Sequence, residues 1–212
     1  MEYIKNPDKI EEKSFEIIQD IIDETRPGYK FFSEIEEMII KRAIHTTADF
    51  DYLDILKISE DAVISIVEAL KSGASIYTDT TMCLSGINKK ILDRLGVKYR
   101  CLIADQDTIE LSKSKSITRS MAAVEIAAKD TNDKIFVFGN APTALYKAIE
   151  MIEESKLKAS AIIGVPVGFV GAEDSKEALI NTKINYIVSR GRKGGSNLAA
   201  AIINAILYYY FK

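Results

Sequence analysis

Isoleucines recur at helical spacing near the start of the chain. They predict a helix over residues 7–24, with Asn6 as its N-cap and proline in the first helical position. A capping box, Ser33-Glu34-Ile35-Glu36, predicts a second helix that ends near His45. A serine followed by two acidic residues predicts a third helix over residues 59–73, which ends at a glycine. The chain therefore opens with a helical segment.

From residue 74 onward, short runs of β-forming residues alternate with helical patterns. The predicted strands are residues 74–78, 98–104, 134–138, 159–165 and 185–189. The predicted helices are residues 88–95, 118–129, 142–154, 174–181 and 196–210. Most of these strands are almost continuously apolar, which is typical of strands covered on both faces. The pattern predicts an α/β fold: a doubly wound, mostly parallel sheet of about five strands with helices on both faces, preceded by the N-terminal helical segment.

The composition narrows the class of protein. The 212 residues are 47% hydrophobic and 28% charged, so residues 1–212 are interpreted as one globular domain. A formal net charge of −3 argues against a nucleic-acid binder, and two cysteines with one histidine exclude a disulfide scaffold or a zinc site rich in such ligands. The N-terminal segment shows no signal-peptide pattern, and the apolar run over residues 198–211 is shorter than the about 20 residues that span a bilayer. We expect a cytoplasmic protein with no membrane partner.

His45 is the first candidate for chemistry, because histidine is the side chain whose ordinary pKa lies near neutrality. Helical spacing places Arg42 on the same face, and its charge would repel an imidazolium, so the pair favours an anion between them. Ser14 interrupts the apolar stripe of the first helix and would place a polar group on an inward face. The three residues predict a polar pocket between the first two helices and the sheet. A satisfied core or interface histidine and a helix-packing serine are the alternatives.

Parallel sheets bind ligands beyond the carboxyl ends of their strands. Asn140 and Thr143 lie there in a loop that runs directly into a helix, whose N–H groups could bind a carboxylate or phosphate. Arg190 and Arg192 lie in a glycine-rich basic loop before the last helix and could clamp an anion. Arg119, at the start of another helix, is a similar candidate. A tight turn and a solvated basic loop are the structural alternatives, and the sequence holds no Walker or dinucleotide-binding pattern.

The remaining reactive side chains predict little chemistry. Cys83 and Cys101 have no histidine nearby in the sequence, so both are interpreted as structural thiols. Asp49, Asp51 and Asp54 lack EF-hand spacing, which favours a solvated acidic loop over a cation site. No protein-bound metal is predicted.

Several of these segments together resemble the precorrin-8X methylmutase family, also called cobalt-precorrin-8 methylmutases, of corrinoid (vitamin B12) biosynthesis. The matching segments are residues 12–15, 41–50, 140–145, 164–172 with 175–176, and 190–196. They extend over nearly the whole chain in the family's order, and the blocks Pro-Val-Gly-Phe-Val-Gly and Asn-Ala-Pro-Thr-Ala-Leu are specific. The run Thr46-Thr47-Ala48-Asp49-Phe50 is more similar to the cobalt-dependent, anaerobic-route members.

The resemblance implies an isomerase that moves a methyl group from carbon 11 to carbon 12 of precorrin-8 or cobalt-precorrin-8, giving hydrogenobyrinate or cobyrinate. The family's catalytic histidine maps onto His45, and its substrate-contacting serine and arginine map onto Ser14 and Arg42. Members are homodimers of a doubly wound α/β fold that bind the corrinoid near the subunit interface. The resemblance implies no organic cofactor and no protein-bound metal, because any cobalt arrives inside the substrate.

The residues are compatible with such a substrate, which is a large, mostly apolar ring with several carboxylates. It needs an apolar cleft with a basic and polar rim. The candidate rim residues are Arg42, Arg119, Asn140, Thr143, Arg190 and Arg192. Two alternative functions are a non-catalytic corrinoid carrier and a phosphate- or nucleotide-handling α/β enzyme. His45 is our candidate for the proton donor and acceptor of the methyl shift.

Overall fold

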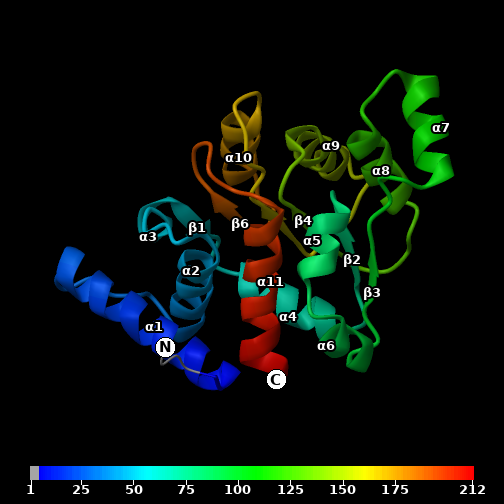
Figure 1. Cartoon of the computed structure of the whole chain (residues 1–212). Helices are drawn as coiled ribbons and strands as arrows, with labels where there is room; N and C mark the ends of the chain where they lie inside the picture. Colours follow the sequence, from blue (N-terminus) through cyan, green and yellow to red (C-terminus); the bar gives the residue numbers. More distant parts are fainter. Residues whose placement is uncertain (1–4) are drawn as a thin grey trace.

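A six-stranded sheet forms the centre of the computed structural model, which describes residues 5–212 (Figure 1). The first four residues lie outside the described residues, and the prediction that the N-terminal segment is no signal peptide falls partly on them. The strand order is β1-β6-β5-β4-β2-β3, and all neighbours are parallel except β1, which is antiparallel to β6. The strands are β1 (Leu56–Ile58), β2 (Ser75–Thr78), β3 (Lys98–Arg100), β4 (Lys134–Phe138), β5 (Ala161–Gly164) and β6 (Tyr186–Ser189). The five predicted strands are therefore confirmed, and β1 is a sixth that the sequence did not predict.

Helices cover both faces of the sheet, as predicted. They are α1 (Pro7–Thr25), α2 (Glu34–Thr47), α3 (Tyr52–Ile55), α4 (Ala62–Lys71), α5 (Thr81–Gly86), α6 (Lys89–Arg94), α7 (Gln106–Lys115), α8 (Arg119–Ala127), α9 (Pro142–Glu153), α10 (Ala172–Ile180) and α11 (Ser196–Phe211). Side chains alternate across β4: Ile135 and Val137 join one core with α2, α4 and α11, whereas Phe136 and Phe138 join the other with α8, α9 and α10. This alternation explains why the strand is apolar throughout.

The elements that the sequence did not predict are short or weakly patterned. β1 has three residues, and α3 has four. The ten residues of α7 bury only Thr108 and Ser112, so the helix has no apolar stripe to detect. The predicted capping box is present, since the Ser33 hydroxyl accepts the N–H of Glu36 at 3.2 Å. Its glutamate, however, accepts the N–H of Phe32 rather than that of Ser33.

The orientation of α1 corrects one prediction. Ile18 and Ile22 are its buried side chains, whereas Ile10 and Ile17 are 45% and 47% exposed. Ser14 is half-buried, and its hydroxyl donates to the carbonyl of Ile10 at 2.7 Å within the same helix. The stripe that contains Ser14 therefore does not face the core, and α1 lies against α2, away from the sheet (Figure 1).

Lys193, in the loop between β6 and α11, connects this loop to the end of α2. Its ammonium pairs with Asp49 and with Asp51, the latter at 2.6 Å. Its carbonyl accepts from Ser189 at 2.8 Å and from Lys176 at 2.9 Å. Lys176 is fully buried, and this burial lowers its pKa to about 8. The acidic residues after α2 are solvent-accessible, as predicted, since Asp51 and Asp54 are 64% and 52% exposed, but they also form ion pairs, Asp54 with Arg26.

Asp130, in the loop before β4, ties that loop to β2 near the amino ends of the strands. Its carboxylate accepts from Ser75 at 2.6 Å, from Tyr77 at 2.8 Å and from the Asn132 N–H at 3.0 Å. Burial alone would raise its pKa, but the three hydrogen bonds outweigh this effect and lower the pKa to about 2. The charged carboxylate therefore stabilises the fold at neutral pH.

We expect Asp130→Asn to lower the free energy of unfolding by about 1–2 kcal/mol at neutral pH, after allowing for partial exposure of the carboxylate. Because the folded pKa lies below the unfolded one, this contribution is complete above about pH 4 and is lost as the pH falls toward about 2. Urea unfolding of both proteins at neutral pH and near pH 3 measures the difference. A difference in the free energy of unfolding that is the same at both pH values would contradict the lowered pKa of Asp130.

Candidate functional site

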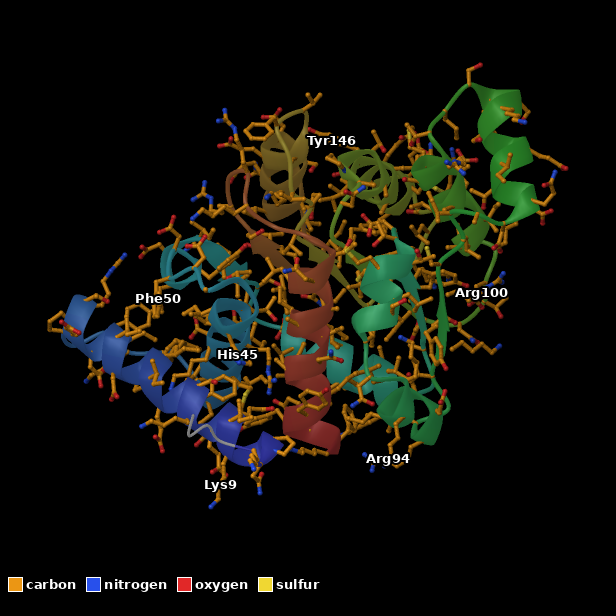
Figure 2. All side chains as sticks on the ribbon, viewed as in Figure 1. Lys9, His45, Phe50, Arg94, Arg100 and Tyr146 are labelled. Carbon is orange, nitrogen blue, oxygen red and sulfur yellow. The ribbon has the colours of Figure 1, made fainter. Side chains whose placement is uncertain are left out.

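His45 lies in the last turn of α2, and its side chain is exposed (Figure 2). Its ring centroid is 5.7 Å from that of Phe15, a residue of α1. His45 is therefore not a core histidine of this chain, and the alternative of an interface histidine stays a prediction. An exposed imidazole beside an aromatic ring can meet an apolar ligand and exchange a proton with it.

Arg42 lies one turn before His45 and is held from three sides. Its guanidinium carbon is 5.1 Å from the Phe15 ring centroid and 5.2 Å from that of Tyr208, so the charge is placed between two aromatic rings. Nη2 donates to Glu11 at 2.6 Å, while Nε is buried and has no hydrogen-bond partner among residues 5–212. Glu11 of α1 is therefore an anionic partner of Arg42 within the chain, and the anion expected between Arg42 and His45 stays a prediction.

A groove between α1 and α2 has a volume of about 640 Å³, but its charge is unfavourable for an anionic ligand. Four glutamates line it, accompanied by Lys41, and His45 is not among its lining residues. The four are Glu12, Glu16, Glu34 and Glu37. A ligand with several carboxylates would be repelled there, so the exposed side of His45 is the better place for it.

Thr143 and Arg119 are brought together by one hydroxyl contact. Thr118 caps α8 by accepting the N–H of Met121 at 3.2 Å, and its hydroxyl lies 3.0 Å from that of Thr143 at the start of α9. Arg119 is the first residue of α8, and both it and Asn140 are exposed. Three of the predicted binding residues thus form one rim at the carboxyl ends of the strands.

The backbone of the β4–α9 loop cannot bind an anion in the way the sequence suggested. Its three N–H groups, those of Gly139, Asn140 and Ala141, already donate to the carboxylate of Asp79 at 3.1, 2.7 and 2.6 Å. The next residue is Pro142, which has no N–H. Burial raises the pKa of Asp79, although the three amide donors favour its charged form. The predicted phosphate or carboxylate cradle is therefore occupied from inside the protein.

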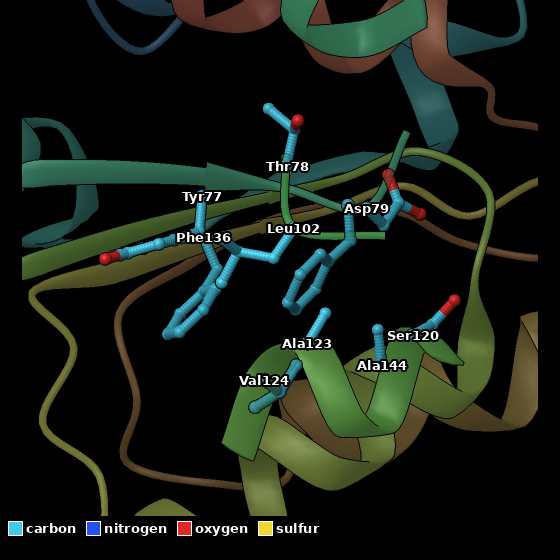
Figure 3. Close-up of a pocket in the computed structure, with 10 residues that line it drawn as sticks. Tyr77, Thr78, Asp79, Leu102, Ser120, Ala123, Val124, Phe136 and Ala144 are labelled. Carbon is cyan, nitrogen blue, oxygen red and sulfur yellow. The ribbon is translucent and has the colours of Figure 1, made fainter. Parts of the chain in front are cut away.

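A small cavity lies beside Asp79, between the sheet and α8 with α9 (Figure 3). Ser120 and Asp79 lie at one end of it, and the rest of its wall is largely apolar. Its volume is about 10 Å³, which is about the space of one water molecule. It is too small for a ligand, so substrate must bind outside it.

The basic loop before α11 is also largely neutralised. Arg190 donates to both carboxylate oxygens of Glu177, at 2.7 and 2.9 Å. The Arg192 guanidinium is mostly exposed, with Glu173 at 4.0 Å and the Phe169 ring centroid at 5.6 Å. Phe169 is itself 86% exposed, so this loop offers an apolar surface as well as a cation. The sequence singled out the cations but not the aromatic ring beside them.

The predicted residues do not all lie together in one chain. Figure 1 shows α2, which carries His45 and Arg42, on the opposite side of α11 from α8, which carries Arg119.

Cys83 and Cys101 are free thiols whose pKa values are raised by burial, which leaves them poor nucleophiles. The described residues contain no group of three or more side chains arranged to hold a metal, and none of their helices is long and apolar enough to cross a membrane.

Comparisons with known proteins agree with this architecture. The sequence model of the family "Precorrin-8X methylmutase" matches residues 9–209. A cobalt-precorrin-8 methylmutase of Salmonella typhimurium is 54% identical over 210 residues, covering 99% of this chain and 98% of that protein. A precorrin-8X methylmutase of Sinorhizobium is 35% identical over 207 residues, covering 97% and 96%.

A solved structure extends the likeness to the fold. The precorrin-8X methyl mutase of Thermus thermophilus superposes with a TM-score of 0.83 at 35% identity, and the match covers 94% of each chain. The family match therefore rests on both sequence and three-dimensional structure. The chain belongs to the precorrin-8X methylmutase family and is a methylmutase, an isomerase of cobalamin biosynthesis.

Proposed function

We propose that the chain converts cobalt-precorrin-8 into cobyrinate by moving a methyl group from ring carbon 11 to ring carbon 12. The relative from Salmonella typhimurium, at 54% identity, is named for the cobalt-containing substrate, whereas the relative from Sinorhizobium, at 35%, is named for precorrin-8X. Metal-free precorrin-8 is therefore the second candidate. The observation that carries the proposal is the exposed imidazole of His45, the only histidine of a methylmutase chain.

His45 acts in this proposal as an acid and then as a base. Protonation of the conjugated ring makes it electron-poor, which favours migration of the methyl group with its bonding electrons. The bond from carbon 11 to the methyl group breaks while the bond from carbon 12 forms, and the borrowed proton returns to the imidazole. Because the shift is intramolecular, no methyl donor is needed. The proposal therefore includes no organic cofactor and no protein-bound metal, and cobalt enters only as part of the substrate.

Ser14 and Arg42 would orient the ring beside His45. The aromatic rings on either side of Arg42 restrict its guanidinium, so it presents a fixed charge to a carboxylate of the substrate. Glu11 already neutralises this charge, so a substrate carboxylate would share or replace that ion pair. Arg42 is therefore expected to determine the orientation of the ring more than its affinity.

Arg119 is the strongest candidate for binding a substrate carboxylate. It forms no ion pair with another described residue, and it lies at the N-terminus of α8, where the helix dipole also attracts anions. The Arg119 guanidinium and the partial positive charge of the helix N-terminus repel each other until an anion binds between them. Asn140 and Thr143 would complete this rim, and Arg192 with Arg190 would lie further along the edge of the sheet.

We propose a homodimer that works in the cytoplasm. In Figure 1, α11 lies between α2, which carries His45, and α8, which carries Arg119, and a dimer would let two chains supply one side each to a single corrinoid. Ile10 and Ile17 lie two turns apart on the exposed face of α1, and a dimer interface there would bury both side chains.

Replacing His45 by alanine is expected to lower kcat about 10²–10⁴-fold, the usual contribution of a general acid–base group, while leaving corrinoid binding intact. The absorption change of the corrinoid gives kcat, and a titration with product gives Kd. Asp130→Asn is the matched control for loss of stability, and its kcat should equal that of the wild type. Turnover of the His45→Ala protein at the wild-type rate would end the proposed role.

Arg119→Ala is expected to raise KM about tenfold to a hundredfold, because a hydrogen bond to a charged group contributes about 1.5–3 kcal/mol. The matched control is Arg94→Ala, since Arg94 is also an exposed arginine but lies at the far end of the molecule, on α6 (Figure 2). Initial rates at a series of substrate concentrations separate KM from kcat. Equal KM values for the two variants would remove Arg119 from the site.

The homodimer predicts a particle of twice the chain mass of 23.6 kDa in light scattering after size exclusion. Ile17→Glu should shift the protein toward the monomer, because it places a charge in the proposed apolar contact. A wild-type protein that elutes with the mass of one chain at micromolar concentration would contradict the proposal.

A further inference from the structure

Asp79 is a buried carboxylate at the end of β2 that the proposed chemistry does not use. Its side chain is 4% exposed and takes part in no ion pair within the described part of the chain. Its partners are the three consecutive N–H groups of the β4–α9 loop, at 2.6 to 3.1 Å. A buried charge is costly unless it is hydrogen-bonded in this way, so the loop and the carboxylate stabilise each other.

The same loop is confined on its other side by α11. A Cβ atom on Gly139 would lie 2.6 Å from Cα of Ser196, so the loop backbone touches the start of that helix. Thr80, the residue after Asp79, reaches the same helix, since its hydroxyl lies 2.7 Å from that of Ser196. The loop therefore has one position, between the Asp79 carboxylate and the backbone of α11.

The position of the loop determines where the proposed carboxylate rim lies. Asn140 is part of the loop, and Ala141 is the N-cap of α9 without any side-chain cap of its own. Thr143, in the first turn of α9, contacts Thr118, which is followed directly by Arg119. A shift of the loop would thus move all three proposed binding residues of the rim.

We propose that Asp79 is a positioning residue for substrate binding: by holding the β4–α9 loop, it sets the places of Arg119, Asn140 and Thr143 toward a carboxylate of the corrinoid. This inference rests on the rim described under the proposed function. Asp79 does not touch substrate, because its side chain is enclosed by the loop that it holds.

The test compares Asp79→Asn with Asp130→Asn in assays with cobalt-precorrin-8. Both changes remove a carboxylate that connects β2 with a loop next to β4, but at opposite ends of the sheet. We expect Asp79→Asn to raise KM about tenfold or more with kcat within about threefold of wild type, because an amide cannot accept all three N–H groups. Asp130→Asn should lose stability with no change in KM. A KM for Asp79→Asn equal to that of wild type overturns the inference.

A double-mutant cycle distinguishes positioning from a general loss of stability. If Asp79 acts through Arg119, Asp79→Asn should raise KM much less in the Arg119→Ala background than in the wild type. Full additivity of the two changes would overturn the inference. The cycle also separates the two proposals. An unchanged KM in the Arg119→Ala protein rejects the carboxylate rim itself. A raised KM in the Arg119→Ala protein, together with a wild-type KM in the Asp79→Asn protein, rejects only the role of Asp79.

Asp79→Ser provides a second variant in case the asparagine protein does not fold. Its hydroxyl can still accept one N–H, and the space it leaves can admit water beside the existing cavity. The same rise in KM is expected for it. If neither variant folds while Asp130→Asn does, Asp79 is a determinant of folding only and the positioning role is rejected.

Discussion

The three hydrogen bonds that Asp79 accepts are the interaction on which the carboxyl edge of the sheet depends. In a parallel sheet the loops at this edge carry backbone groups that no strand pairs, and a ligand or a side chain must satisfy them. Here an internal carboxylate does so for residues 139–141. As a result the backbone of this loop is already paired before any substrate arrives, so the proposed anion binding at this edge falls to side chains.

The same principle applies to three cations of the chain. Arg42, Arg190 and Lys193 each have an internal carboxylate partner: Glu11, Glu177 and the Asp49–Asp51 pair, respectively. A chain with a net charge of −3 therefore neutralises these cations locally, two of them (Arg190 and Lys193) at its surface. Arg119 and, to a lesser degree, Arg192 are the predicted binding arginines without a close carboxylate partner among residues 5–212, and both are exposed.

The sequence was most informative where hydrophobic patterns were long. The apolar run over β4 and the helical period of α9 predicted those elements to within one residue. The sequence pattern did not predict which face of α1 is buried. Ile10 and Ile17 follow the same helical spacing as Ile18, and only the contact with α2 decides which stripe is buried.

The contacts that build the site lie beyond any local pattern. Asp79 bonds to a loop 60 residues later, and Lys193 pairs with an aspartate 144 residues earlier. An aspartate directly after a buried strand was the only local signal for Asp79. His45, Ser14 and Arg42 were adjacent candidates from spacing alone, but their roles came from the family resemblance, since no pattern distinguishes a catalytic histidine from a structural one.

The paired and unpaired arginines should contribute differently to recognition of a corrinoid. A substrate carboxylate that replaces Glu11 on Arg42 exchanges one ion pair for another, so the gain in free energy is small, whereas the geometry imposed by Phe15 and Tyr208 is retained. A carboxylate that meets Arg119 forms an ion pair that did not exist before. In the proposed complex, affinity would therefore come mainly from the side of the ring at Arg119, and orientation from the side at Arg42. This division would suit the proposed methyl shift, in which the reacting carbons lie beside His45 in one orientation while the rest of the ring is held elsewhere.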